Sequence, residues 1–206
     1  EYIDRNIKAT LSAYGLGDVE ASAYNAKTTA EAGQLMDDAE STTSIRLLDP
    51  NLVSPAFKQR QQNKQYYSFD SQLNVDRYGV SGESRDTVIA VRELSQEGLE
   101  NGQRTWINDH TVYTHGYGVV TAYGNTASSD GSPAFWEGGI PSEGELGEYE
   151  PRIYFGKSTP SYSIVGGDDG GNPRELDYPD DSAPSGQINT TFSGSGGPNV
   201  SNPFNR

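Results

Sequence analysis

From Tyr66 onward, apolar and polar residues alternate along the chain with the period of two that is typical of β-strands. The clearest segments are 72–80 (QLNVDRYGV) and 86–94 (DTVIAVREL). Residues 82–84 (GES) between them supply a turn, so the two segments predict an antiparallel hairpin. Apolar side chains in 88–91 occupy both faces of the second segment, which indicates a strand in the interior of a sheet.

Further short strands are expected on both sides of this hairpin. They lie at 45–50, 65–69, 106–120, 119–124, 151–156 and 161–166. The acidic, glycine-rich stretch at 138–151 lacks large aliphatic residues and is expected to be an exposed loop.

The N-terminal part of the chain has helical periodicity instead. Ile3, Ile7, Leu11 and Tyr14 recur at spacings of four and three, which aligns them on one face of a helix. A second helix is expected from a cap at Thr29 to residue 40, because its composition favours the helical state. A third is expected to begin at Ser54-Pro55 and to run through 56–62, since proline is favoured in the first helical turn.

Glycine and proline limit the length of all these elements. The chain has 24 glycines and 11 prolines, and only 33% of its residues are hydrophobic, so apolar material must be concentrated in short segments between turns. We expect an α+β fold, with short N-terminal helices followed by a mainly antiparallel sheet and long Gly/Pro-rich loops. A single domain over 1–206 would be mainly helical in 1–65, mainly β in 66–166 and turn-rich in 167–206.

Charge and cysteine content exclude several functional classes. The formal net charge of −14 argues against nucleic acid as a partner and against docking on anionic lipid. Absence of cysteine excludes disulfides and thiol catalysis. No apolar run reaches the roughly 20 residues that span a bilayer, and no signal peptide is evident. A start at Glu1 without methionine suggests a segment of a larger protein.

Both histidines lie in one motif, WINDHTVYTHGYGVV, at 106–120. A separation of five residues puts His110 and His115 on opposite faces of a strand, about 16 Å apart. On a helix, the same separation rotates them by about 140°. A shared metal site is therefore not expected, and the sequence predicts no metal ligand.

His115 precedes Gly116 and Gly118, where the missing Cβ atoms permit unusual dihedral angles or close approach of another backbone or a ligand. One interpretation is a hydrogen-bonded core histidine beside a kinked strand. The other is a ligand contact, with aromatic rings as stacking surfaces and histidine as the polar anchor. The candidate ligand-binding residues are Trp106, Asn108, His110, Tyr113, Thr114, His115 and Tyr117.

No other motif indicates a reaction. No G-x-S-x-G nucleophile elbow occurs, and 29 acidic residues offer too many carboxylate pairs to single one out. The acidic stretch from Asp168 to Asp181 is dense enough in oxygen ligands for calcium, but lacks EF-hand spacing and also fits a solvated loop. We predict no catalytic residue and no cofactor, and expect a binding protein more than an enzyme.

Four segments, in order, resemble one family: YIDRNIKATLSAYGL, RTWINDHTVYTHGYGVV, PRIYFGK and ELDYP. Together they are similar to the soluble region of the actinobacterial and cyanobacterial multi-pass membrane proteins known as uncharacterised protein family 0182. The resemblance implies transmembrane helices before Glu1 and a position at the cell membrane, on its extracytoplasmic side. It implies no reaction.

Three functions are compatible with these observations. The first is an extracytoplasmic module of a membrane protein that binds an envelope lipid, a glycan or a protein partner through 106–118. The second is a metal-assisted hydrolase of envelope polymers, with a histidine and distant carboxylates. The third is a structural platform that assembles with the protein's own transmembrane region.

Overall fold

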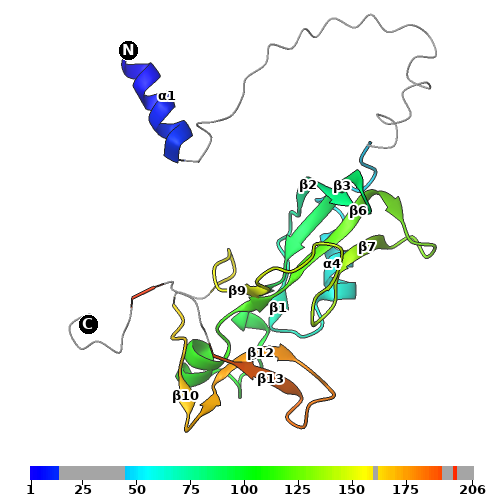
Figure 1. The fold of residues 1–206 in the computed structure, drawn as a ribbon. Coiled ribbons are helices and arrows are strands. Elements are labelled where there is room, and N and C mark those ends of the chain that lie inside the picture. Colours follow the sequence, from blue (N-terminus) through cyan, green and yellow to red (C-terminus); the bar gives the residue numbers. More distant parts are fainter. Residues whose placement is uncertain (14–44, 160–161, 192–196, 199–206) are drawn as a thin grey trace, which may run out of the picture. The chain divides into compact units, whose positions relative to one another are not determined.

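The computed structural model describes residues 1–13, 45–159, 162–191 and 197–198, and the chain divides into two compact units, 1–39 and 40–206 (Figure 1). In the first unit, helix α1 (Tyr2–Ala13) has the predicted period, and Ile3, Ile7 and Leu11 lie exposed along it. The helix predicted at 29–40 lies outside the described residues. Among the described helices, none is long and apolar enough to cross a membrane.

The largest sheet of the second unit has five antiparallel strands in the order β2-β3-β6-β7-β8, and Figure 1 shows that it curls. These strands are β2 (Asn74–Val80), β3 (Glu83–Val91), β6 (Val119–Ala127), β7 (Pro133–Gly138) and β8 (Glu143–Gly144). The predicted hairpin is confirmed as β2–β3, and β3 is an interior strand because it also pairs with β6. Its turn is shorter than predicted: Ser81 and Gly82 both have positive φ, of 52° and 83°, as a two-residue hairpin loop of the I′ kind requires.

The hydrophobic core lies between this sheet and helix α4 (Ser54–Gln61), which begins at the predicted serine and proline. Phe57 of α4 is fully buried and packs edge-on against Phe69 and Phe135, at ring-centroid distances of 6.1 and 5.0 Å. The buried core residues are Phe57, Phe69, Leu73, Val88, Ala90, Val120 and Ala122.

Within the described residues of the second unit, four two-stranded antiparallel ladders and two short helices make up the rest of the regular structure. The ladders are β1 (Tyr67–Ser68) with β4 (Glu93–Leu94), β5 (Gly116–Tyr117) with β9 (Arg152–Ile153), β10 (Asp168–Asp169) with β11 (Asn172–Pro173), and β12 (Glu175–Pro179) with β13 (Gln187–Thr190). The helices are the 3₁₀-helix η1 (Gln96–Gly98) and the π-helix η2 (Asn108–Val112). This architecture confirms the predicted α+β class.

The structure corrects four local predictions. Residues 45–49 form no strand, because the backbone N–H groups of Leu47 and Leu48 both donate to one acceptor, Gly124 O. The first part of the histidine motif is the helix η2 and not a strand. Residues 162–166 pair with no strand, whereas the C-terminal segment that we expected to be turn-rich contains the β12–β13 hairpin.

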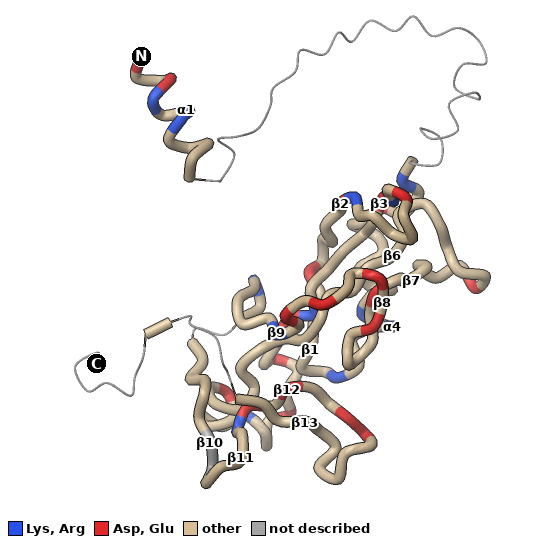
Figure 2. Tube along the Cα trace, viewed as in Figure 1, with Lys and Arg blue, Asp and Glu red and all other residues tan. Residues whose placement is uncertain are grey.

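Acidic residues gather along β8 and the chain that leads from it toward β9 (Figure 2). Glu143, Glu145, Glu148 and Glu150 are exposed there, as predicted. The prediction of a loop throughout 138–151 was wrong, because this stretch includes β8 and the end of β7. Their exposure lets water solvate the negative charges, and Glu145 also accepts hydrogen bonds from Ser81.

Candidate functional site

The histidine motif separates into an exposed part and a buried part. Trp106 is 58% exposed, while Asn108 and His110 are partly exposed on η2. Thr114, His115 and Tyr117 are buried, and Tyr113 is partly buried. The two histidines therefore have different surroundings. The ligand-binding role of all seven residues stays a prediction.

Three aromatic rings gather in the exposed part, and we call Trp106, His110 and Tyr162 the aromatic cluster. The rings of His110 and Tyr162 stack in parallel, 4.1 Å apart with 3° between their planes. His110 Nδ1 lies 2.9 Å from Tyr162 O, and a carbonyl oxygen only accepts, so Nδ1 is the donor. Trp106 Nε1 donates to Tyr162 Oη at 3.3 Å, and Tyr162 is 50% exposed. The cluster is exposed, yet its rings are fixed relative to one another.

Hydrogen bonds between η2 and the segment before it hold η2 in place. Arg104 Nε donates to both carboxylate oxygens of Asp109 at 3.0 Å. Gln96 donates through its amide to Asp109 O, and Asn108 Nδ2 donates to Gln103 O at 2.9 Å. These polar contacts leave no trace in the hydropathy pattern, which is why periodicity did not predict the π-helix.

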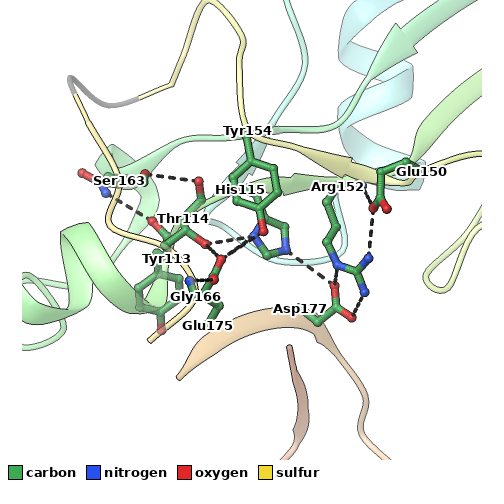
Figure 3. Close-up of polar contacts among 11 residues, drawn as sticks. Tyr113, Thr114, His115, Glu150, Arg152, Tyr154, Ser163, Gly166, Glu175 and Asp177 are labelled. Carbon is green, nitrogen blue, oxygen red and sulfur yellow. Dashed lines mark hydrogen bonds and ion pairs between the residues drawn. The ribbon is translucent and has the colours of Figure 1, made fainter. Parts of the chain in front are cut away.

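The buried part belongs to a network of polar side chains, drawn in Figure 3, that we call the ionic network. Its members are Thr114, His115, Arg152, Tyr154, Glu175 and Asp177. His115 is 2% exposed, and Glu175 and Asp177 are 0% and 4% exposed. Since β12 places residues 175 and 177 two apart, both carboxylates face the imidazole from the same strand.

The two nitrogens of His115 face different carboxylates. Nδ1 lies 2.9 Å from Thr114 Oγ1 and 3.7 Å from Glu175 Oε2. Thr114 donates its one hydroxyl hydrogen to Glu175 at 2.7 Å, so it accepts from Nδ1–H. Nε2 makes no well-aligned hydrogen bond among the described residues but lies 3.5 Å from Asp177 Oδ1. Oxygen acceptors beside both nitrogens favour the doubly protonated imidazolium.

The carboxylates have further donors. Glu175 also accepts from Tyr154 Oη at 3.0 Å and from the backbone N–H of Gly166 at 2.8 Å. Asp177 binds the Arg152 guanidinium through two hydrogen bonds of 2.8 and 2.9 Å, a bidentate geometry that is stronger than a single contact. With two cations and two anions, the network is electrically balanced.

Burial and charge act against each other on these pKa values. Burial by itself would lower the pKa of His115, but the close carboxylates of Asp177 and Glu175 outweigh it, and the pKa is raised above its ordinary value. Burial would raise the pKa of both carboxyl groups. For Glu175, the contacts with His115, Gly166, Thr114 and Tyr154 lower the pKa instead; for Asp177, His115 and Arg152 do so. The four ionisable groups thus stabilise one another's charged forms.

Glycine at 116 allows the backbones around His115 to approach closely, as one of the two sequence interpretations anticipated. A Cβ at Gly116 would lie 2.1 Å from the carbonyl oxygen of Arg92, and Gly118 has a φ of +79°. Tyr117 N donates to Arg92 O at 2.9 Å. The contact at Gly116 is with protein backbone.

The geometry of the ionic network does not resemble a metal centre, because its carboxylates lie on opposite nitrogens of one ring and do not converge on a point. Among the described residues, no three His, Cys, Asp or Glu side chains form a group that could hold a metal ion. In the acidic stretch from Asp168 to Asp181, for which calcium binding and a solvated loop were both open, Asp180 accepts from Ser182, and Asp181 pairs with Lys64. The side chains of 168 and 169 lie outside the description.

A polar cleft of about 430 Å³ lies beside η1. It is lined by Ser95, Gln96, Glu97, Arg104, Lys157 and Ser158. Both of its cations have acidic partners, Arg104 with Asp109 and Lys157 with Asp70. Neither cation of the cleft is therefore without an acidic partner.

Sequence reasoning missed Tyr162 in the cluster and Arg152, Tyr154, Glu175 and Asp177 in the network. A weak signal was present, because R-I-Y at 152–154 and E-L-D at 175–177 place polar side chains two apart with one aliphatic residue between them. In a strand this spacing puts both polar groups on one face.

The comparisons with known proteins agree with the resemblance in the sequence. The profile of the Uncharacterised protein family (UPF0182) matches residues 1–206. Curated UPF0182 proteins of Paenarthrobacter aurescens, Leifsonia xyli and Bifidobacterium adolescentis are 58%, 55% and 56% identical to the chain, and each match covers all of it. The chain spans only 21%, 21% and 19% of those proteins, and no solved structure matches it. The chain belongs to the UPF0182 family.

Proposed function

We propose that this chain is an interaction module on the extracytoplasmic side of a UPF0182 membrane protein. It binds a cell-envelope component or a protein partner through the aromatic cluster. The observation behind this proposal is the exposure of Trp106 and Tyr162, at 58% and 50%, on a fixed framework. Tryptophan and tyrosine are the residue types that contribute most at interaction surfaces, because each presents a large rigid ring with a polar tip.

The cluster is arranged before any partner arrives. Stacking fixes His110 on Tyr162, and the indole N–H of Trp106 is already bonded to the Tyr162 hydroxyl. Binding through rings that are already ordered costs less conformational entropy than ordering free side chains. Ile107, 55% exposed beside Trp106, extends the apolar surface that a partner can cover.

The membrane context comes from the family resemblance seen in the sequence. Because the chain spans about a fifth of its curated relatives, the rest of the protein is a candidate partner beside lipid, glycan and separate proteins. In the structural alternative, the cluster contacts the protein's own transmembrane region. At His115 the hydrolase alternative is less favoured, since this histidine and its two carboxylates are at most 4% exposed.

The test compares three forms of the full-length protein isolated from its own membranes: wild type, Trp106→Ala and Leu52→Ala. Leu52 is a matched control, because it is 74% exposed and precedes α4, outside the cluster. Cross-linking followed by mass spectrometry identifies bound lipids, glycans, proteins and internal contacts. We expect one species to be lost from Trp106→Ala and retained by Leu52→Ala. Identical profiles for all three would refute the proposal, and a lost cross-link to the protein's own helices would favour the structural platform.

A further inference from the structure

Residues 162–166 connect the aromatic cluster to the ionic network through four hydrogen bonds. At the exposed end, His110 Nδ1 donates to Tyr162 O, and Ile164 N donates to His110 O at 2.7 Å. In the middle, Ser163 Oγ donates to Thr114 O at 3.3 Å. At the buried end, Gly166 N donates to Glu175 Oε1 at 2.8 Å. A displacement of Glu175 therefore has a direct path to the backbone that supports Tyr162.

The position of Glu175 depends on the proton of His115. The groups in contact with this imidazole are Glu175 and Asp177 from β12, Tyr154 just after β9, and Thr114 beside it in the chain. Arg152 from β9 is bound to Asp177, and Tyr117 of β5 interacts electrostatically with Asp177. With the imidazole protonated, two cations balance two anions. Without that proton, Glu175 and Asp177 both lose the cation that lies between them, while Arg152 stays bound to Asp177 and to the exposed Glu150. The Nε2 lone pair then points toward Asp177 Oδ1 at 3.5 Å. Charge imbalance in a buried site favours separation of β12 from the imidazole.

We propose that His115 is a proton switch that couples the docking of β12 to the arrangement of the aromatic cluster. With His115 protonated, β12 and residues 162–166 stay docked and the cluster keeps its geometry. When His115 loses its proton, β12 and residues 162–166 loosen, and His110 and Tyr162 lose their fixed stacking. The part of this inference that concerns partner binding rests on the proposed function, whereas the coupling itself does not.

The direction of the pH effect follows from the charges. A raised pKa means that His115 keeps its proton through its ordinary range and loses it on the alkaline side. The neighbours do not titrate there: the pKa values of Glu175 and Asp177 are lowered, that of Tyr154 is raised, and that of Tyr117 is raised to about 12. Opening is therefore expected as pH rises through the titration of His115.

Hydrogen exchange measured by mass spectrometry on the full-length protein tests the coupling without any ligand. The informative peptides cover 162–166 and 175–179, and a peptide from β3 is the internal control. After correction for the intrinsic effect of pH, exchange of the first two should rise about tenfold for each unit by which the docked pKa exceeds that of the open state. The β3 peptide should show no such rise.

Two histidine variants show which histidine causes the pH-dependent exchange. His110 is the other histidine of the chain, so His110→Gln must keep the pH-dependent exchange of 175–179 if His115 is the switch. His115→Gln, neutral at every pH, should exchange rapidly and without pH dependence in both peptides. If His115→Gln fails to fold, the pH curves of wild type and His110→Gln still show whether His110 is responsible for the pH dependence. Exchange that does not change with pH, or a pH dependence that disappears with His110→Gln, overturns the switch. Intact coupling with no partner captured at any pH would instead refute the proposed function.

Discussion

Replacing Asp177 with asparagine is the most direct test of the ionic network, because the two side chains have nearly the same shape and differ in charge. Asp177 is 4% exposed and binds Arg152 at 2.8 and 2.9 Å. It also lies 3.5 Å from His115 Nε2. Asp177→Asn leaves two cationic groups facing a single buried carboxylate, that of Glu175.

The size of the effect follows from the surroundings of Arg152. Removing one member of a buried ion pair typically costs about 3–5 kcal/mol. The Arg152 side chain is 27% exposed and keeps a 3.0 Å ion pair with Glu150, so water and that carboxylate offset part of the loss. We expect the lower end, about 3 kcal/mol, which corresponds to a Tm decrease of about 6–12 °C for a domain of this size.

Thermal unfolding followed by circular dichroism measures this decrease, with Asp181→Asn as the matched control. Asp181 is 93% exposed and pairs with Lys64 only at 3.3 Å, so its substitution should leave Tm unchanged. Because the pKa of Asp177 is lowered in the folded state, its stabilisation is present above the ordinary carboxyl pKa and disappears as pH falls through the folded value. The difference in Tm between wild type and Asp177→Asn should therefore become smaller in acid. An unchanged Tm at pH 6, or an equal decrease for Asp181→Asn, would show that the network does not stabilise the fold.

Three further outcomes are expected. Gly116→Ala should lower Tm by several degrees, because its Cβ would lie 2.1 Å from a backbone oxygen. Gly79→Ala is the control and should leave Tm unchanged, because no atom lies within 4 Å of its Cβ position; equal effects of the two substitutions would contradict the close approach at Gly116. Phe57→Ala should cost about 3–5 kcal/mol in urea unfolding, since it removes a fully buried ring from the core; a loss under 1 kcal/mol would mean that the core refills the space. The raised pKa of His115 predicts that wild-type stability falls as pH rises through the folded pKa, and a Tm unaffected by alkaline pH would contradict it.

The predictable part of this fold is encoded locally. The β2–β3 hairpin follows from alternation and a turn, and α4 follows from Ser54-Pro55. The turn was displaced because Ser81 adopts a positive φ that serine rarely favours, while Gly82 was correctly a turn residue. In both features the information lies within about ten residues of the chain.

The ionic network could not be predicted, because its members come from three separate segments, 114–115, 152–154 and 175–177. Hydropathy treats Glu175 and Asp177 as surface residues, yet they are buried, since each gains partners that appear only after folding. For the same reason, the C-terminal segment was predicted to be turn-rich. Local composition did not reveal the tertiary contacts that make β12 a strand.

The network also accounts for the register in which β12 docks. Glu175 and Asp177 face His115, so a slip of one residue would present Leu176 and Tyr178 to the imidazole and move both carboxylates away from it. The β12–β13 ladder is irregular between Leu176 and Tyr178, and Asp177 has no paired residue on β13, which is how a bulge re-aims a side chain. An apolar interface of similar volume could be equally stable, but it would distinguish the correct register less sharply. We therefore expect the four charges to matter more for the position of β12, and through 162–166 for the aromatic cluster, than for net stability.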